Sequence, residues 1–251
     1  MIKIICSKDA AGVGVNAAKV MAEVIKENPT AVLGLATGSS PIGMYKELIK
    51  LNKANEISFK DIKSVNLDEY VGLSADHDQS YSYFMHDNLF NHVDIKEENV
   101  NLPNGLAKDP AAECKRYDDV IKSMGGIDIQ LLGIGNNGHI GFNEPDDYFT
   151  DGTSLVNLTD STIDANSRFF ESRDMVPTQA LSMGVGQIMA AKKVLMVAMG
   201  KGKAEILEKA FFGKVTPAVP ASILQFFKGE VILCADEEAL SVIKEKHPEA
   251  V

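Results

Sequence analysis

Short runs of apolar residues recur along the chain and are separated by longer stretches that mix apolar and polar side chains. The runs are brief and rich in β-branched residues, which is typical of strands buried on both faces of a sheet. The pattern therefore predicts strands at 2–6, 31–35, 65–67, 127–133, 194–199 and 231–234.

The intervening stretches repeat apolar residues every three or four positions, as amphipathic helices do. The clearest stripes lie at 17–25, 45–51, 206–211 and 240–243. This alternation of strand and helix predicts an α/β fold: a single-domain, doubly wound, mostly parallel sheet with helices on both faces, in a Rossmann-like arrangement. Repeats and Pro/Gly/Ser-rich linkers are absent from the sequence, so we expect residues 1–251 to form one domain.

Composition and charge narrow the classes of partner. The 251 residues are 45% hydrophobic and 24% charged, as in an ordinary globular protein. The formal net charge of −10 argues against a nucleic-acid or membrane partner, and an anionic small substrate would need a local group of cations. Because no apolar stretch approaches the ~18 residues of a membrane span, and because the three cysteines lack CxxC spacing, we expect a cytoplasmic protein with free thiols.

Small, polar or ionisable residues follow four of the predicted strands. They form the segments 37–41, 68–70, 135–139 and 200–203. In open α/β sheets, ligands bind at the carboxyl ends of the strands. The sequence therefore predicts a ligand site at this edge of the sheet.

The first segment, Thr37-Gly38-Ser39-Ser40-Pro41, joins a predicted strand to a predicted helix. Gly38 permits a tight turn, Ser40 suits the N-cap and Pro41 suits the first helical position. Backbone N–H groups at a helix N-terminus attract phosphate. An ordinary capped turn is the alternative, and a Walker A loop is excluded because no Gly-Lys-Ser/Thr follows.

Two glycine patterns resemble dinucleotide-binding motifs, GVGVNA at 12–17 and GIGNNG at 133–138. The first begins six residues beyond Cys6, too far for a strand to feed into a phosphate turn. The second continues into His139 and Pro145 rather than into a helix. Because neither glycine pattern lies in a strand–turn–helix unit, we expect no dinucleotide cofactor.

Candidate acid–base groups lie in the second and third segments. Asp68 follows a predicted strand, and partial burial there would suit a general base, although a solvated turn acid is the plainer alternative. Only one of Asp68 and Glu69 need face the site, because adjacent residues diverge. In the loop 133–145, His139 can exchange protons near neutral pH and Glu144 can orient its ring.

The remaining histidines and cations were weighed in the same way. His77, His86 and His92 match no zinc spacing, so we expect no metal site. A GxSxG hydrolase elbow is also missing. Arg168 and Lys203 are each more often surface charges, but together they could supply the cations that a phosphate needs.

Taken together, five segments resemble the glucosamine-6-phosphate deaminase family. They are LATGSSP (35–41), NLDEYVGL (66–73), GIGNNGHIGFNEP (133–145), ANSRFF (165–170) and MGKGKAE (199–205). The resemblance implies a cytoplasmic enzyme of amino-sugar catabolism. Without a cofactor, it would convert glucosamine 6-phosphate and water to fructose 6-phosphate and ammonium.

The resemblance also implies a role for each matching residue. Asp68 would move a proton between C2 and C1, and His139 would open the sugar ring with Glu144 and Asn137. The phosphate would be held by Thr37, Gly38, Ser39, Ser40, Arg168 and Lys203.

Two departures from the family pattern matter. Many members have Asp where this chain has Asn137, and an amide can orient His139 but cannot stabilise an imidazolium as a carboxylate would. The loop after Glu144, with Ser154 and Val156, lacks the basic residues of allosterically activated members, and the chain ends early. We therefore expect an unregulated enzyme and leave open whether it forms a homo-oligomer.

Two other functions stay open. 6-Phosphogluconolactonase shares the fold and a GxGxxGH loop, but that family has Asp-Glu-Arg where this chain has Asp68-Glu69-Tyr70 and lacks the continuation at 142–145. A sugar-phosphate-sensing regulator of the same fold would carry a basic DNA-binding segment. This chain begins with a predicted strand and is acidic, which disfavours that role.

Overall fold

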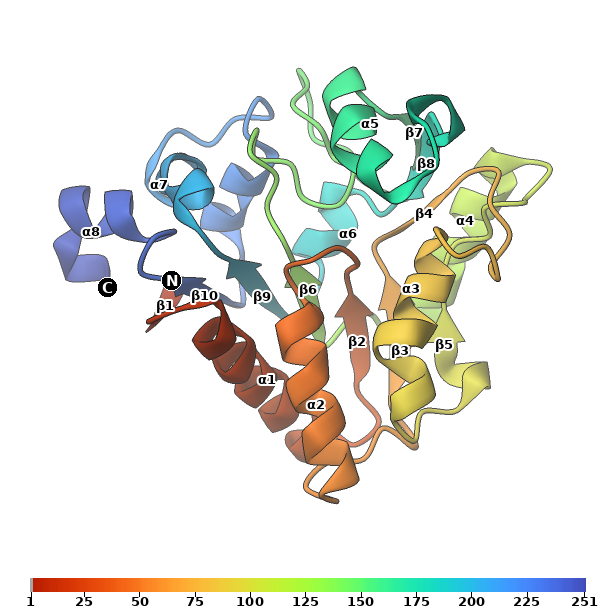
Figure 1. Ribbon diagram of the computed structural model, residues 1–251, viewed down its shortest axis with the longest axis horizontal. Coiled ribbons are helices and arrows are strands. Elements are labelled where there is room, and N and C mark those ends of the chain that lie inside the picture. Colours follow the sequence, from red (N-terminus) through yellow and green to blue (C-terminus); the bar gives the residue numbers. More distant parts are fainter. Residues whose placement is uncertain (1) are drawn as a thin grey trace.

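The computed structural model describes residues 2–251, and its main feature is a seven-stranded parallel sheet (Figure 1). The spatial order is β1-β10-β9-β6-β2-β3-β5. These strands are β1 (Ile2–Ser7), β2 (Val32–Leu35), β3 (Lys63–Asn66), β5 (Val100–Asn101), β6 (Ile129–Leu132), β9 (Lys193–Ala198) and β10 (Glu230–Asp236). The predicted fold class is confirmed, and each of the six predicted strands overlaps an observed one.

The order of the strands contains a topological switch point. After β2 the chain adds β3 and β5 on one side of it, and then returns to place β6, β9 and β10 on the other side. Strands β2 and β6 pair through Leu33 with Ile129 and Gly34 with Gln130. The loops that follow these two strands therefore leave the sheet side by side, where doubly wound folds bind their ligands.

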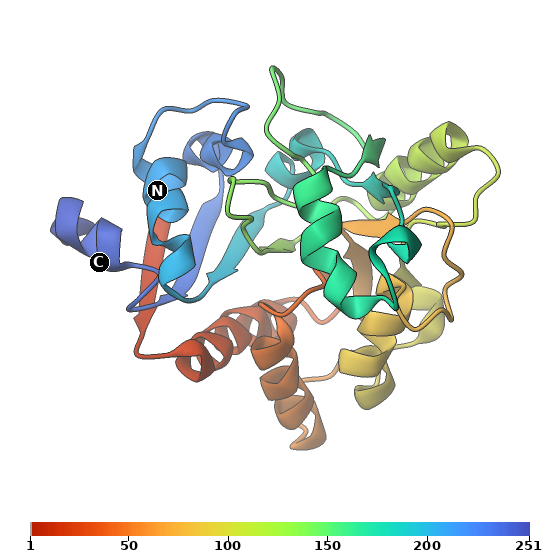
Figure 2. The same ribbon diagram turned by 45° about the horizontal axis from the view of Figure 1, so that its top comes forward.

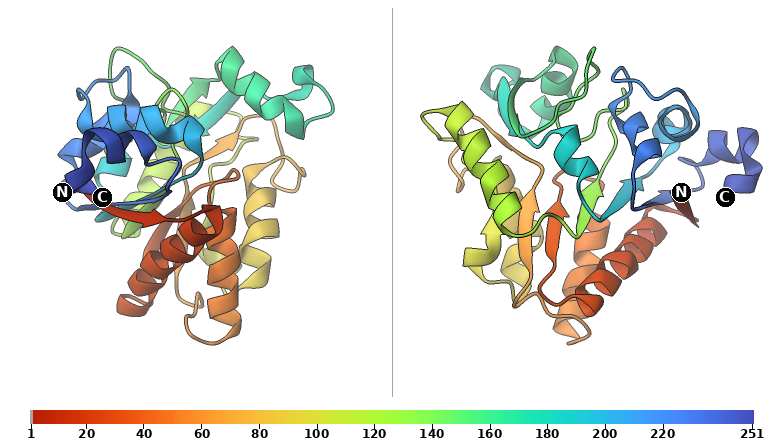
Figure 3. Two further views of the ribbon diagram at one scale, coloured as in Figure 1. Left: turned by 60° about the vertical axis from the view of Figure 1, so that its left-hand side comes forward. Right: turned by 180° about the vertical axis from the view of Figure 1, so that it is seen from behind.

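Helices lie on both faces of this sheet (Figures 1 and 3). α1 (Ala10–Glu27), α2 (Ile42–Lys53) and α3 (Tyr81–Asn88) cover one face. α4 (Pro110–Ser123) and α6 (Val185–Met189) lie on the other, and α7 (Ala204–Phe212) packs with α8 (Ser241–Lys246). The short 3-10 helices are η1 (Phe90–His92), η2 (Glu97–Asn99), η3 (Ser167–Phe169), η4 (Arg173–Met175), η5 (Lys201–Lys203), η6 (Pro220–Phe226) and η7 (Pro248–Ala250).

The first glycine pattern has a packing role. Gly12 and Gly14 lie inside α1, and a Cβ atom on Gly14 would stand 2.8 Å from the carbonyl carbon of Gly43 in α2. Gly14 therefore lets α1 and α2 approach closely, and the pattern does not form a turn after a strand. This agrees with the inference that residues 12–17 are not a dinucleotide motif.

A second, smaller sheet lies above the carboxyl ends of the parallel strands (Figures 1 and 2). It contains β4 (Asp68–Tyr70), β8 (Gln179–Ser182) and β7 (Ser154–Asn157), paired antiparallel in that order, with α5 (Asp160–Asn166) beside it. Residues 68–70 follow the predicted strand at 65–67 as expected, but they also form a strand of this second sheet, and the alternative of a solvated turn acid is excluded because Asp68 is buried. Its small apolar core contains Tyr70, Phe142, Leu158, Ile163, Val176 and Ala180.

Within residues 2–251, no helix is long and apolar enough to cross a bilayer.

Candidate active site

The loop between β2 and α2 is the predicted phosphate loop. Gly38 adopts a φ of +93°, a left-handed conformation that residues with a side chain rarely take. Both Gly38 and Ser39 are exposed. The Ser40 hydroxyl lies 4.0 Å from the point where a Cβ on Gly133 would stand, so this loop lies beside the loop that follows β6. The predicted cap was wrong by one residue: α2 begins at Ile42, and Pro41 occupies the cap position instead of Ser40.

The glycine-rich loop 133–145 brings its own backbone under the imidazole of His139. A Cβ atom on Gly135 would lie 2.4 Å from Cε1 and 2.5 Å from Nδ1 of that ring. The Gly135 N–H donates to the carbonyl of His139 at 2.9 Å, and Gly138 holds a φ of +91°. The ring can therefore rest against the backbone only because residue 135 has no side chain.

Three predicted catalytic residues of this loop meet. Nδ1 of His139 lies 3.3 Å from Oε1 of Glu144, which is ion-pair distance, although the angle does not meet hydrogen-bond geometry. The Asn137 amide donates to Oε2 of Glu144 at 2.6 Å, and its carbonyl oxygen accepts from the His139 backbone N–H at 3.2 Å. Asn137 thus fixes Glu144 from one side, while Thr162 of α5 donates to Oε1 at 2.7 Å from another.

Glu144 is held as a carboxylate. Burial alone would raise its pKa, but the close approach of His139, together with the hydrogen bonds from the Thr162 hydroxyl and the Asn137 amide, lowers the pKa to about 2. The negative charge is therefore present throughout the neutral range. It can orient the imidazole of His139, whose Nδ1 lies 3.3 Å away.

Asp68 approaches the same loop from β4. Its side chain is buried, and Oδ2 lies 3.8 Å from the point where a Cβ on Gly141 would stand. Its strand partner is Ser182 of β8, whose hydroxyl accepts from the Phe142 N–H at 3.0 Å. Burial, with a smaller contribution from the charge of Glu69, raises the pKa of Asp68 to about 8. A carboxylate with this pKa is a far stronger base than an exposed one.

The predicted cations differ in how the structure places them. Lys203, at the end of η5, donates to the carbonyl of Ile134 and to Oδ1 of Asn136, each at 2.7 Å. Burial lowers its pKa. Lys203 is thus fastened to the same loop that carries His139. Arg168 lies on η3, after α5, and its side chain is exposed.

Sequence reasoning missed the side chains that hold the catalytic loop in shape. The buried Asn143 amide donates to the carbonyls of Ile140 and Met183, at 2.8 and 2.9 Å, and Oδ1 accepts from Thr150. These contacts fasten the loop to the end of β8. An asparagine between an aromatic residue and Glu144-Pro145 carries no signal of this role, because its partners are distant in sequence.

The other histidines have local structural partners. Nδ1 of His86 lies 2.8 Å from the Ser82 carbonyl, and Nε2 of His92 lies 2.8 Å from the Asp87 carbonyl. His77 accepts from the Gln79 N–H at 3.0 Å. In the described part of the chain, no three His, Cys, Asp or Glu side chains are grouped closely enough to hold a metal ion.

The topology and this acid–base site define a class of sugar-phosphate enzyme, and comparison with known proteins agrees. A family model described as glucosamine-6-phosphate isomerases/6-phosphogluconolactonase matches residues 8–233. The chain belongs to this family.

Within the family, the chain is similar in sequence to deaminases. A glucosamine-6-phosphate deaminase of Clostridium perfringens (strain 13 / Type A) is 53% identical over 243 residues, covering 97% of this chain and 100% of the relative. One of Thermoanaerobacter sp. (strain X514) is 49% identical over 245 residues, covering 98% of this chain and 96% of the relative. The resemblance inferred from the five sequence segments is confirmed.

Solved structures give the same picture. A monomeric glucosamine-6-phosphate deaminase has a TM-score of 0.92 and 45% identity, covering 96% of this chain and 100% of its own. A 6-phosphogluconolactonase from Trypanosoma cruzi has a TM-score of 0.77 at 21% identity, covering 98% and 97%. The second similarity shows a common fold alone.

Proposed function

We propose that this chain converts glucosamine 6-phosphate and water to fructose 6-phosphate and ammonium. The observation that carries the proposal is the meeting of two separate acid–base groups at one sheet edge. One is His139 with Glu144 and Asn137, and the other is Asp68. Relatives about half identical to the chain, named glucosamine-6-phosphate deaminase, support the same reaction.

The phosphate group of the substrate would bind at the loop after β2, beside the loop that carries His139, with Lys203 and Arg168 as its cations. Thr37, Gly38, Ser39 and Ser40 offer N–H and hydroxyl donors beside Gly133. Lys203 is already oriented by its two hydrogen bonds and adds a point charge, while Arg168 adds a planar fork. Binding the phosphate places the reacting carbons without taking part in bond making.

The sugar ring must open first, because the C2 proton becomes acidic only beside an aldehyde. The anomeric hydroxyl loses a proton while the ring oxygen gains one, and His139 can carry this proton. Glu144, which stays ionised, stabilises the imidazolium that forms in between. Asn137 orients Glu144 but cannot share this charge.

Isomerisation and deamination follow on the open chain. Asp68 removes the C2 proton to give an enolamine and returns a proton to C1, which leaves a ketimine at C2. Water adds to the ketimine carbon, and ammonia leaves as the C2 carbonyl of fructose 6-phosphate forms. Each general acid–base step contributes about 10²–10⁴-fold to the rate.

We propose further that residues 1–251 act as one catalytic domain in the cytoplasm, without a nucleic-acid, membrane or cofactor partner. The acidic net charge supports this proposal. The deaminase structure that resembles the chain is described as monomeric, and homo-oligomer formation stays a prediction.

The direct test is ammonia release from glucosamine 6-phosphate by the purified protein, with no metal or nucleotide added. We expect ammonia and fructose 6-phosphate in equal amounts. A parallel assay with 6-phosphogluconolactone separates the two activities of the family. Lactone hydrolysis without ammonia release would reject the proposal, and so would tight sugar-phosphate binding with no turnover.

The pH dependence of this reaction should show the base. Because Asp68 must be ionised to accept the C2 proton and its pKa is raised to about 8, kcat/KM should rise with pH through the neutral range toward that value. A rate profile measured with a fixed buffer ionic strength checks this. A profile that is flat from mildly acidic to mildly alkaline pH would contradict the assignment.

Replacing Arg168 with alanine should raise KM for glucosamine 6-phosphate by about 10-fold or more, since a charge-assisted phosphate contact contributes about 1.5–3 kcal/mol. The kcat value should change far less, because the guanidinium lies away from the reacting carbons in the proposed complex. Steady-state kinetics of Arg168→Ala and Arg168→Lys measures both constants. An unaltered KM would show that the phosphate binds elsewhere.

A further inference from the structure

Glu69 is a buried carboxylate next to the proposed base, and the reaction as described does not use it. Its side chain is only 2% exposed. Oε1 accepts from the N–H groups of Tyr70 and Tyr81 at 2.8 and 2.9 Å, and Oε2 accepts from the Ser82 N–H at 2.9 Å. Strand β4 is therefore fastened through this side chain to the first turn of α3.

The hydrogen-bond partners of Glu69 are those of an ionised carboxylate. All three partners are N–H donors, and two of them belong to the N-terminal turn of α3, where the helix dipole stabilises a negative charge. Burial is the larger effect and raises the pKa of Glu69 above its ordinary value, while the three N–H groups offset part of that rise. A proton on either oxygen would face donors instead of an acceptor.

Asp68 has the opposite surroundings. As a neighbour on a strand it points to the other side of β4, toward the catalytic loop. In residues 2–251, no N–H or O–H group donates to its carboxylate. The two adjacent carboxyl groups therefore differ in their hydrogen bonds. Glu69 accepts three N–H donors that stabilise its anion, whereas Asp68 has none among the described residues and remains a strong base.

We propose that Glu69 is a positioning residue for the deaminase reaction: it anchors β4 to α3, and its fixed negative charge keeps Asp68 a strong base. This inference rests on the proposed function. In a coupled pair of carboxyl groups, one group stays ionised and the other holds a proton. Here Asp68, which has fewer hydrogen-bond donors than Glu69 in the described part of the chain, is the group that holds the proton.

The other titratable groups around the pair are neutral near pH 7 or belong to the catalytic loop. They are Tyr70 on β4, Tyr81 on α3 and Tyr117 on α4; the loop that approaches Asp68 at Gly141 also carries His139 and Glu144. Burial raises the pKa of all three tyrosines, and that of Tyr70 reaches about 12. Glu69 is therefore the charge that acts on Asp68 from its own strand.

The test is the pH profile of kcat/KM for Glu69→Gln. Removing the negative charge should make Asp68 ionise more readily, so the acidic limb should move to lower pH by about one unit or more. The plateau rate should also fall, because a weaker base takes the C2 proton more slowly. Glu69→Asp, which keeps the charge, should restore the position of the limb.

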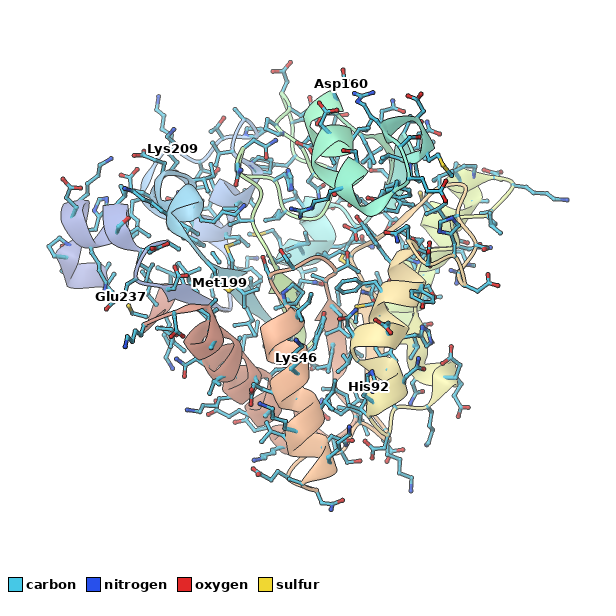
Figure 4. The ribbon with its side chains drawn as sticks, viewed as in Figure 1. Lys46, His92, Asp160, Met199, Lys209 and Glu237 are labelled. Atoms are coloured by element: carbon cyan, nitrogen blue, oxygen red, sulfur yellow. The ribbon has the colours of Figure 1, made fainter. Side chains whose placement is uncertain are left out.

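Asp94→Asn is the matched control. Asp94 also accepts three hydrogen bonds, from Asn52, Ser58 and the Phe59 N–H. It follows two residues after His92, which lies toward the lower end of the molecule in Figure 4, away from the small sheet. Asp94→Asn should lower the stability of the protein without shifting the acidic side of the kcat/KM profile along the pH axis. A Glu69→Gln profile that changes only in height, like a purely structural defect, would overturn the inference. Absence of ammonia release by the unaltered protein would instead reject the proposed function.

If Glu69→Gln does not fold, infrared spectroscopy of the unaltered protein decides the matter. Isotopic labelling of glutamate separates its carboxyl band from that of aspartate, and Asp68→Asn identifies the Asp68 band. We expect a protonated Asp68 and an ionised Glu69 at neutral pH. A protonated Glu69 there would overturn the inference, because a neutral side chain supplies no charge.

Discussion

Replacing Asp68 with asparagine is expected to lower kcat by about 10²–10⁴-fold, the usual contribution of a general base. The amide keeps the shape of the side chain but cannot accept the C2 proton. Exchange of the C2 hydrogen with solvent should be lost together with ammonia release. Steady-state kinetics and hydrogen exchange into the substrate, followed by NMR, measure the two effects.

Binding and stability provide the controls for this variant. Affinity for fructose 6-phosphate should change little, since the phosphate contacts lie on other loops. Asp68→Asn should be at least as stable as the parent protein near neutral pH. A carboxyl whose pKa is raised to about 8 in the folded state must take up a proton on folding above its unfolded pKa, and this cost disappears with asparagine. Undiminished turnover would show that another group is the base.

The strands of the large sheet could be predicted because they are buried on both faces and therefore read as continuous apolar runs. Val194–Ala198 is fully buried, for example, and its apolar run is unbroken in sequence. The small sheet could not be predicted. In β7 the residues alternate between half-buried and exposed, and β4 is only three residues long. Their pairing depends on β8, more than 100 residues after β4.

The candidate site shows the same division between local and distant information. His139, Glu144 and Asn137 lie within eight residues, and motif reasoning placed them together as the structure does. That only one of Asp68 and Glu69 faces the loop also follows from strand alternation. The direction of Glu69 could not be inferred, because its donors lie on α3 and no local pattern names them. The same holds for Thr162, which reaches Glu144 from α5.

The glycine under the imidazole should be as important as the imidazole itself. Gly135→Ala would place a Cβ atom 2.4–2.5 Å from three ring atoms of His139, far inside van der Waals contact. The ring must then swing away from Glu144, and the proton transfer of ring opening loses its geometry. Because small displacements of catalytic groups can reduce rates by about 100-fold, we expect a loss of that order in kcat.

Gly125→Ala separates this effect from simple destabilisation. Gly125 follows α4 with a φ of +86° and open space around it, so alanine there strains the backbone without touching the site. It should lower the melting temperature and leave kcat unchanged, whereas Gly135→Ala should lower kcat even where it is fully folded. Substrate already in the open-chain form bypasses the proton transfer that His139 performs. Partial recovery of Gly135→Ala with an open-chain analogue would therefore place the defect in ring opening, and equal loss with both substrates would place it in the later steps.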